Sequence, residues 1–196
     1  TPTVMLDSGA NVDCSAAELV QFARLGHVYA RDILGRENPA VGLLSIGEEP
    51  EKGNLAVKEA HQLLLGAGLN FIGNVEGRDI MSDDIDVCIT DGFTGNVVLK
   101  TLEGSVKTVI SALLESFAQP EFKEHAEALM PALLPLYEQM SPDTYGGAVL
   151  LGVDGVCIIA HGASSPRAIE NGINVARELV EHDIVAEIRD VIAAAA

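Results

Sequence analysis

The sequence predicts an α/β fold with a largely parallel sheet that is covered by helices on both faces. Short apolar runs, many of them β-branched, alternate along the chain with longer stretches of helical periodicity. The strand-like runs are apolar almost throughout, which is typical of strands buried on both faces. Polar loops follow them, and in parallel sheets such loops gather at the carboxyl edge of the strands, where ligands bind. We therefore look for function in those loops.

The first predicted strand is Val4–Leu6, and the polar loop Asp7–Asp13 follows it. Ser15 has the side chain of a good N-cap, and Glu18 stands three residues later, at the capping-box position. Apolar residues then recur at helical spacing, so we expect a helix over Ala16–Leu34.

Two further strands are predicted in the first half of the chain. Val41–Ile46 is a buried strand with the loop Gly47–Asn54 behind it, and Leu55–Leu65 is a helix that ends at a glycine. Asn70–Ile72 is the next strand, and we expect its following loop to be Gly73–Asp79.

The centre of the chain combines a buried strand, Asp86–Thr90, with the glycine-rich segment Asp91–Asn96 and a helix over Val97–Leu114. Strand, glycine-rich turn and helix can together direct backbone N–H groups at a phosphate. Thr94 or Asn96 can cap the helix. The alternative is an ordinary strand-to-helix connection that needs small residues for its turn.

The second half continues the alternation less regularly. Glu121–Met140 is helical in pattern but interrupted by Pro131 and Pro135, which we expect to bend it into a hairpin-like turn. The remaining elements follow in order: a turn-rich link Ser141–Gly147, a buried strand Gly155–Ala160, a loop His161–Ser165, a helix with Ser165 as N-cap and Pro166 in its first turn, and a last helix Ile184–Ala195. All loops after strands, the one at His161 included, are expected to converge on one edge.

Composition excludes several function classes. The chain has 196 residues, 48% of them hydrophobic, and a net charge of −17. That charge argues against a nucleic-acid partner and against electrostatic docking on anionic lipid. Apolar runs stay shorter than the roughly 18 residues of a membrane span. The cysteines, Cys14, Cys88 and Cys157, have no metal-binding spacing, so we expect buried reduced thiols in a cytosolic protein.

Five segments carry polar and glycine-rich motifs: LDSGANVDC, GLLSIGEEPEKGN, NFIGNVEGRDI, DGFTGNVVLKTLEG and YGGAVLLGVDGVCIIAHGASS. In this order, and with the helix after the last one, they resemble the acyl-ACP:phosphate acyltransferases, the PlsX family. The resemblance runs from about Met5 to about Val180. The family's additional N-terminal region has no counterpart here, so residues 1–196 are expected to be one α/β region, the C-terminal portion of a longer enzyme.

The resemblance implies a Rossmann-like three-layer sandwich, similar to isocitrate and isopropylmalate dehydrogenases and to phosphotransacetylases. It implies transfer of a long-chain acyl group from acyl carrier protein to inorganic phosphate, giving acyl phosphate for phospholipid synthesis. It also implies a cytoplasmic homodimer that associates peripherally with the membrane. Neither a cofactor nor a metal is expected.

The resemblance assigns catalysis to Lys52 and Asn96. A lysine suits phosphate or oxyanion binding as a compact charge, although a loop lysine can also be merely solvated. Asn96 offers an amide donor at a helix start, and its alternative is a plain N-cap.

Four further residues are candidates for holding phosphate: Asn74, Arg78, Gly95 and His161. Arg78 can grip phosphate with two N–H groups or pair with Glu76 or Asp79. His161 can act as a general base or phosphate ligand, or it can be structural. Asp91 is expected to hold its turn, and the alternative is that it orients Lys52.

Two function classes remain open: a phosphate acyltransferase, and a non-catalytic α/β interaction or oligomerisation module. Related dehydrogenases and serine hydrolases are disfavoured, because GxGxxG after the first strand and GxSxG are both absent. Dimerisation is expected through the helices around Val97–Phe117 and Glu121–Met140. Ala128–Leu136 is the expected membrane contact, unless its leucines pack against the partner subunit.

Overall fold

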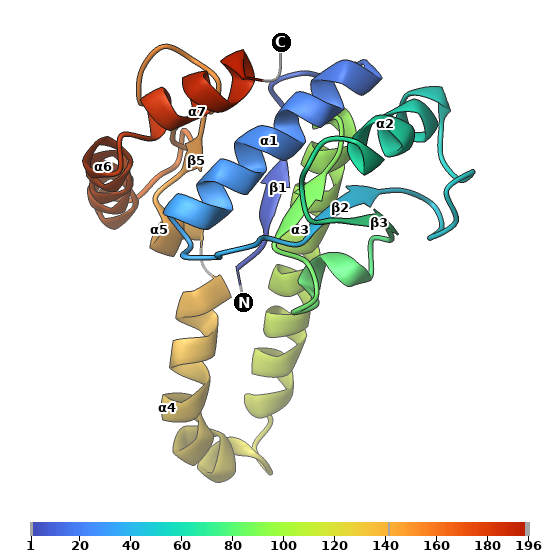
Figure 1. The fold of residues 1–196 in the computed structure, drawn as a ribbon. Helices are drawn as coiled ribbons and strands as arrows, with labels where there is room; N and C mark the ends of the chain where they lie inside the picture. Colours follow the sequence, from blue (N-terminus) through green and yellow to red (C-terminus); the bar gives the residue numbers. More distant parts are fainter. Residues whose placement is uncertain (1, 141, 195–196) are drawn as a thin grey trace. The chain divides into compact units, whose positions relative to one another are not determined.

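The computed structural model describes residues 2–140 and 142–194 (Figure 1). The chain divides into two compact units. The first comprises 1–99, 151–155 and 178–196, and the second comprises 100–150 and 156–177. Each unit is described by itself.

A four-stranded sheet forms the centre of the first unit. Its strands are β1 (Val4–Leu6), β2 (Val41–Leu44), β3 (Phe71–Val75) and β4 (Val87–Ile89). They lie in the order β1-β4-β2-β3, and every neighbouring pair is parallel. The predicted α/β fold with a parallel sheet is therefore confirmed.

The helices α1 (Ala16–Asp32) and α2 (Leu55–Leu65) pack against each other and against one face of this sheet (Figure 1). Ser15 accepts a hydrogen bond from the Glu18 N–H, while the Glu18 carboxylate accepts one from the Ser15 N–H, so the predicted capping box is present. The last helix, α7 (Ile184–Ala193), packs on α1.

The sheet separates two apolar clusters. Val41, Leu43, Val87 and Ile89 pack with buried residues of α1 and α2 on one face. On the other face, Leu44 and Cys88 pack with Ile80, which lies in the 3-10 helix η1 (Asp79–Met81), and with Ile85 and Val98. Buried aliphatic side chains of this kind each contribute about 1.5–3 kcal/mol. The first unit therefore has three layers, as expected.

β3 contains an irregularity that the sequence did not indicate. Its pairing with β2 shifts between Val41 and Gly42, so that Phe71 faces one apolar cluster and Val75 the other. Gly73 has φ +102° at this point. Asn74 consequently lies inside the strand and is buried, and not in the loop after the strand as predicted.

The helix α3 spans Gly92–Phe117 and begins five residues earlier than predicted. Neither Thr94 nor Asn96 caps it. Asp91 does so, because its carboxylate accepts hydrogen bonds from the Thr94 N–H at 2.7 Å and the Thr94 hydroxyl at 2.9 Å. The glycine-rich segment is thus the first part of the helix.

The second unit contains the remainder of α3, α4 (Lys123–Met140), α5 (Pro142–Tyr145), β5 (Ala148–Val149), β6 (Ile158–Ile159) and most of α6 (Pro166–Glu181). α4 is one helix with Pro131 and Pro135 inside it, so the expected hairpin-like turn is wrong. At the start of α6, the Ala168 N–H donates to the Ser165 hydroxyl, as predicted.

The predicted buried strand Gly155–Ala160 is wrong in extent and in place. Only Ile158–Ile159 is a strand, and it pairs antiparallel with β5 in a separate two-stranded sheet. Cys157 is exposed, contrary to expectation, while Cys88 is buried and Cys14 is partly buried. Apolar residues alone cannot distinguish a strand of a central sheet from a short surface strand.

Candidate functional site

Three segments follow neighbouring strands at the carboxyl edge of the first unit's sheet. They are the loop after β1, the loop between β2 and α2, and the start of α3 after β4. Because β4 lies between β1 and β2, the start of α3 lies between the other two segments. Parallel sheets bind ligands at this edge.

The buried carboxylate of Asp7 organises the first loop. It accepts hydrogen bonds from the backbone N–H groups of Gly9, Ala10 and Asn11, and from the Asn11 side chain. Hydrogen bonds to an ionised acceptor are stronger than neutral ones. Asp7 therefore fixes a loop to which sequence analysis gave no anchor, although aspartate at a strand end commonly holds a turn in this way.

The start of α3 is pressed against this first loop. The Gly92 N–H donates to the Asn11 carbonyl at 2.8 Å, and the Gly95 N–H donates to the Asp91 carbonyl at 2.9 Å. A Cβ at Gly95 would collide with the Asp7 carbonyl oxygen. Gly95 thus has a packing role here, and its N–H group has a partner within the chain.

Asn96, the next residue, is exposed and lies alongside the first loop. Its Cβ would be 3.8 Å from a Cβ added at Gly9. No hydrogen bond joins its side chain to any residue in the part of the chain that the structure describes. The amide is therefore available to a ligand at the sheet edge.

Lys52 stands at the end of the loop after β2. Its N–H donates to the Glu49 carbonyl at 3.0 Å, and its aliphatic stem lies over Gly47. Asn54 then caps α2 by accepting from the Val57 N–H. The ammonium group is exposed and, among the described residues, takes part in no ion pair. It is available as a positive charge.

Asn74 occupies a different position from the one we expected of a phosphate ligand. Its side chain is buried, with the Oδ1 atom 2.8 Å from His61 Nδ1 and the Nδ2 atom 2.8 Å from the Glu49 carbonyl oxygen. Sequence analysis overlooked His61, which lies on the buried face of α2 and packs edge-on against Phe71. A single histidine in an amphipathic helix gives no recognisable signal.

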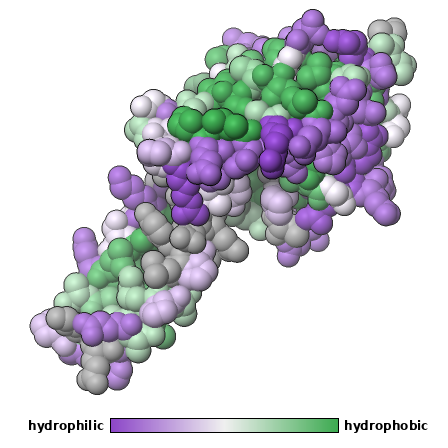
Figure 2. Space-filling view, turned by 90° about the vertical axis from the view of Figure 1, so that its left-hand side faces the viewer, coloured by the Kyte–Doolittle hydropathy of each residue, from purple (hydrophilic) through white to green (hydrophobic). Residues whose placement is uncertain are grey.

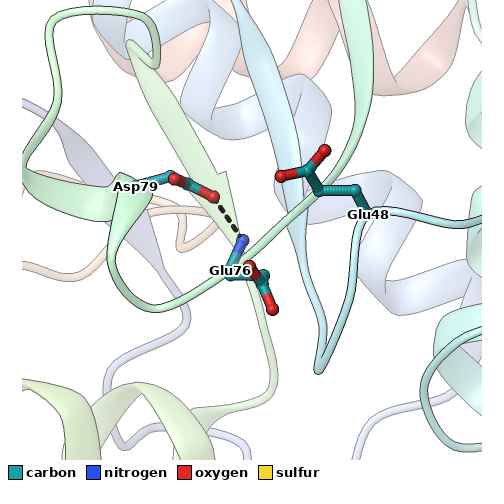
Figure 3. Close-up of side chains that lie close together, drawn as sticks. All are labelled: Glu48, Glu76 and Asp79. Atoms are coloured by element: carbon teal, nitrogen blue, oxygen red, sulfur yellow. Dashed lines mark hydrogen bonds between the residues drawn. The ribbon is translucent and has the colours of Figure 1, made fainter.

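Arg78 lies among three carboxylates, those of Glu48, Glu76 and Asp79. Glu76 is the main cause of a raised Arg78 pKa, and Glu48 and Asp79 add to it. Figure 3 shows the three acidic side chains close together, with Glu48 and Glu76 in loops and Asp79 in η1; one oxygen of each lies within 4.8 Å of the other two. Of the two roles weighed for Arg78, the structure thus shows ion pairing, which also accounts for the closeness of the carboxylates.

His161 belongs to the second unit, in the turn before α6. Its Nδ1 accepts a hydrogen bond from the Ala163 N–H at 3.2 Å, so the proton of the neutral ring is on Nε2. β6 lies outside the parallel sheet, so the expectation that the His161 loop follows a strand of that sheet is wrong.

A cavity of about 410 Å³ opens at the sheet edge of the first unit. It is lined by Val12, Asp13, Cys14, Leu19, Asn54, Ala56, Val57, Asp91, Phe93 and Thr94. Burial raises the pKa of the Cys14 thiol, and the charges of Glu18, Asp7 and Asp91 raise it further against a hydrogen bond from Gly92. Its apolar wall and its carboxylates favour a neutral ligand over an anion.

Comparison with known sequences places the chain. The sequence model of the family described as "Fatty acid synthesis protein" matches residues 1–187. The chain belongs to this family. It is 45% identical over 188 residues to the phosphate acyltransferase of Pelotomaculum thermopropionicum. The alignment covers 95% of this chain and 55% of the relative.

Two further members of the family are similarly close. The phosphate acyltransferase of Acidobacterium capsulatum is 50% identical over 183 residues, covering 90% of this chain and 53% of the relative. The phosphate acyltransferase of Syntrophotalea carbinolica is 49% identical over 183 residues, and this alignment covers 93% of this chain and 53% of the relative. The chain thus spans about half the length of the curated relatives it matches. No helix within residues 2–140 and 142–194 combines the length and apolar content needed to cross a bilayer.

Proposed function

We propose that this chain is part of a phosphate acyltransferase that transfers an acyl group from a thioester to inorganic phosphate. A phosphate oxygen attacks the carbonyl carbon and forms the new C–O bond. The C–S bond breaks, its electron pair leaves with sulfur, and the thiolate takes up a proton. The products are an acyl phosphate and a free thiol.

The observation that carries this proposal is the pair of available donors at one sheet edge. Lys52 and Asn96 follow neighbouring strands, are exposed, and are bonded to no other described side chain. Lys52 provides charge for phosphate, and the Asn96 amide provides a donor for the oxyanion of the tetrahedral intermediate. A thiolate leaves readily, so the reaction needs no strong acid at this edge.

The other candidates take supporting roles in this proposal. Gly95 brings Asn96 close to the first loop. Asn74 holds the loop that carries Lys52. Arg78 neutralises part of the negative charge of the three carboxylates that surround it. His161 is a separate candidate in the second unit, where its Nε2–H can donate to a phosphate oxygen. The cavity beside Thr94 has room for the neutral part of the thioester.

The identity of the donor as long-chain acyl carrier protein, and the use of the product in phospholipid synthesis, come from the family resemblance. The names of the relatives support the reaction type. A non-catalytic module remains the competing function.

The proposal is tested by incubating the full-length protein with an acyl carrier protein thioester and phosphate, and by measuring the release of the free thiol. Lys52→Ala and Asn96→Ala should each lower kcat by about 10²-fold, the usual size for one lost oxyanion donor. Lys58→Ala, an exposed lysine one turn into α2, is a matched control that should keep full activity. Wild-type rates for both folded site variants would refute the roles, and absence of turnover in the wild type would favour the non-catalytic module.

We also propose that the protein is a homodimer in contact with the membrane surface. All of α3 is described, yet only Gly92 and Gly95 of its residues are buried, and Val109, Leu113 and Leu114 are exposed. Leu129 is 51% exposed on α4, while the side chains of Leu134 and Leu136 lie outside the described residues. Exposed apolar surface of this kind usually marks an interface.

Apolar side chains are also exposed on α6, at Ile169, Ile173 and Val180. Figure 2, which views the molecule from the left-hand side of Figure 1, shows a patch of apolar residues on the surface. A partner subunit has more than one apolar surface available to it, so the choice of α3 and α4 as the dimer interface is a separate point to test.

A further inference from the structure

We propose that His61 is a positioning residue for Lys52, acting through the buried side chain of Asn74. This inference rests on the proposed function, in which Lys52 meets phosphate. His61 and Asn74 are only 4% and 6% exposed, and neither can reach solvent ligands from inside the first unit. Their hydrogen bonds connect the core face of α2 to the backbone of the Lys52 loop.

The network admits one arrangement of protons. The Glu49 carbonyl can only accept, so the Asn74 atom that faces it is the Nδ2 donor. Oδ1 then faces His61 and requires a donor, so His61 carries its proton on Nδ1. The Glu49 carbonyl therefore sets which way the Asn74 amide faces, and the His61 Nδ1–H group holds it there by donating to the amide oxygen.

The Glu49 carbonyl is the point at which this network holds the loop. It accepts from Asn74 Nδ2 at 2.8 Å and from the Lys52 N–H at 3.0 Å. The stretch from Glu48 to Lys52 is exposed, and its other side-chain attachment is the ion pair between Glu48 and Arg78, which is open to solvent. Exposed ion pairs contribute little to holding a segment in place. The buried amide thus holds the Lys52 loop from the core side, while the Asn54 cap holds the chain where α2 begins.

Buried polar pairs also stabilise protein cores that have no functional site. The test must therefore distinguish an effect on the position of Lys52 from an effect on the stability of the fold. Asn74→Asp keeps the shape of the side chain and an acceptor for His61, but turns an acceptor toward the Glu49 carbonyl. His61→Leu removes the donor, and His61→Asn restores a donor at the δ position. Asn70→Asp is the matched control, because Asn70 also donates from Nδ2 to a carbonyl, that of Asn38, before the opposite end of β3.

The first measurement is hydrogen exchange of the Lys52 amide in the folded protein. Asn74→Asp and His61→Leu should speed this exchange at least about tenfold, His61→Asn should restore most of the protection, and Asn70→Asp should change nothing at Lys52. Unchanged exchange in both site variants would overturn the inference. Because this measurement needs no turnover, it decides the structural claim even if the proposed reaction is wrong.

The second measurement is a double-mutant cycle in thiol release by the full-length enzyme. Asn74→Asp should lower kcat by about 10- to 100-fold, the effect of displacing a reacting group by about 1 Å. Combined with Lys52→Ala it should cost little more than Lys52→Ala alone, because both changes remove the same contribution. Additive losses would overturn the inference. A Lys52→Ala variant with full activity would instead refute the proposed function, leaving the exchange result to decide on His61.

Discussion

Two glycines of the same helix should respond oppositely to the same substitution. Gly95 lies in the first turns of α3, where an added Cβ meets the Asp7 carbonyl oxygen and a Thr90 methyl group at 3.1 Å. Gly104 lies further along α3, and among the described residues no atom outside its own helix turn comes within 4 Å of its added Cβ. Alanine at either position adds one methyl group to a helix.

The expected magnitudes follow from these surroundings. At Gly104 the helix gains propensity, so Gly104→Ala should stabilise by about 0.8–1.0 kcal/mol. At Gly95 the same gain is outweighed, because the obstacle is backbone that Asp7 and the parallel pairing of β1 hold in place. Overpacking of this kind costs about 1–3 kcal/mol. Because the gain in helix propensity is common to both positions, the two variants should differ by the overpacking cost alone, about 1–3 kcal/mol.

Urea unfolding followed by circular dichroism measures both free energies, with thermal unfolding as a check. We expect the Gly95→Ala midpoint below the wild type and the Gly104→Ala midpoint above it. In the full-length enzyme Gly95→Ala should also lower thiol release, because α3 must move away from the first loop and takes Asn96 with it. Equal free energies of unfolding for the two variants would refute the packing role of Gly95.

Three further predictions concern other parts of the chain. Maleimide should label the exposed Cys157 first and Cys14 more slowly. Cys88 should react only on unfolding, because burial raises the pKa of its thiol to about 12. Fast labelling of Cys88 in the native state would contradict its buried position in the sheet. Burial and the nearby charge of Arg31 lower the pKa of His27, while Asp32 acts in the opposite direction. As the pH falls, His27 is therefore protonated in the unfolded chain before it is protonated in the folded chain. The free energy of unfolding should consequently decrease as the pH drops below about 6.5. His27→Gln should lessen this fall in urea titrations at pH values above and below that point, and an unchanged fall would rule out His27 as its source. Leu129→Glu with Leu133→Glu should reduce co-sedimentation with liposomes while sedimentation velocity still reports a dimer; dissociation of the dimer would instead assign these leucines to the subunit interface.

Local signals in the sequence were sufficient for part of the fold. Ser15 and Glu18 form their capping box within four residues, and α2 begins after Asn54 and ends before Gly66, as predicted. Such features depend on neighbours in the chain, so spacing alone reveals them. The parallel sheet was inferred from the alternation of apolar strands with helices, which is also a pattern along the chain.

Features that depend on distant partners could not be predicted. Asn74 is buried in β3 because His61 and the Glu49 carbonyl satisfy its amide, and the sequence gives no sign of either contact. α3 begins at Gly92 because the Asp91 carboxylate caps it there. A glycine-rich segment normally indicates a loop, and tertiary packing against Asp7 overrides that tendency here.

The candidate site shows the same division. Lys52 and Asn96 came from the resemblance to a family, whereas His61 and Asp7, which hold the surrounding loops, came only from the structure. Residues that act on a ligand lie in recognisable loop motifs, but the residues that support them are scattered among ordinary core positions. No spacing rule connects His61 to Lys52.

Whether a polar side chain is satisfied within the chain separates these two groups physically. Hydrogen bonds to backbone groups are formed by the side chains of Asp7, Asp91 and Asn74. Substitution of these residues should therefore lower both the free energy of unfolding and the activity. Lys52 and Asn96 are exposed and bonded to no other described side chain, so their loss should cost activity while leaving the free energy of unfolding nearly unchanged. Ligand-binding groups must stay unsatisfied until the ligand arrives, whereas the Asp7, Asp91 and Asn74 side chains beside them already have partners within the chain.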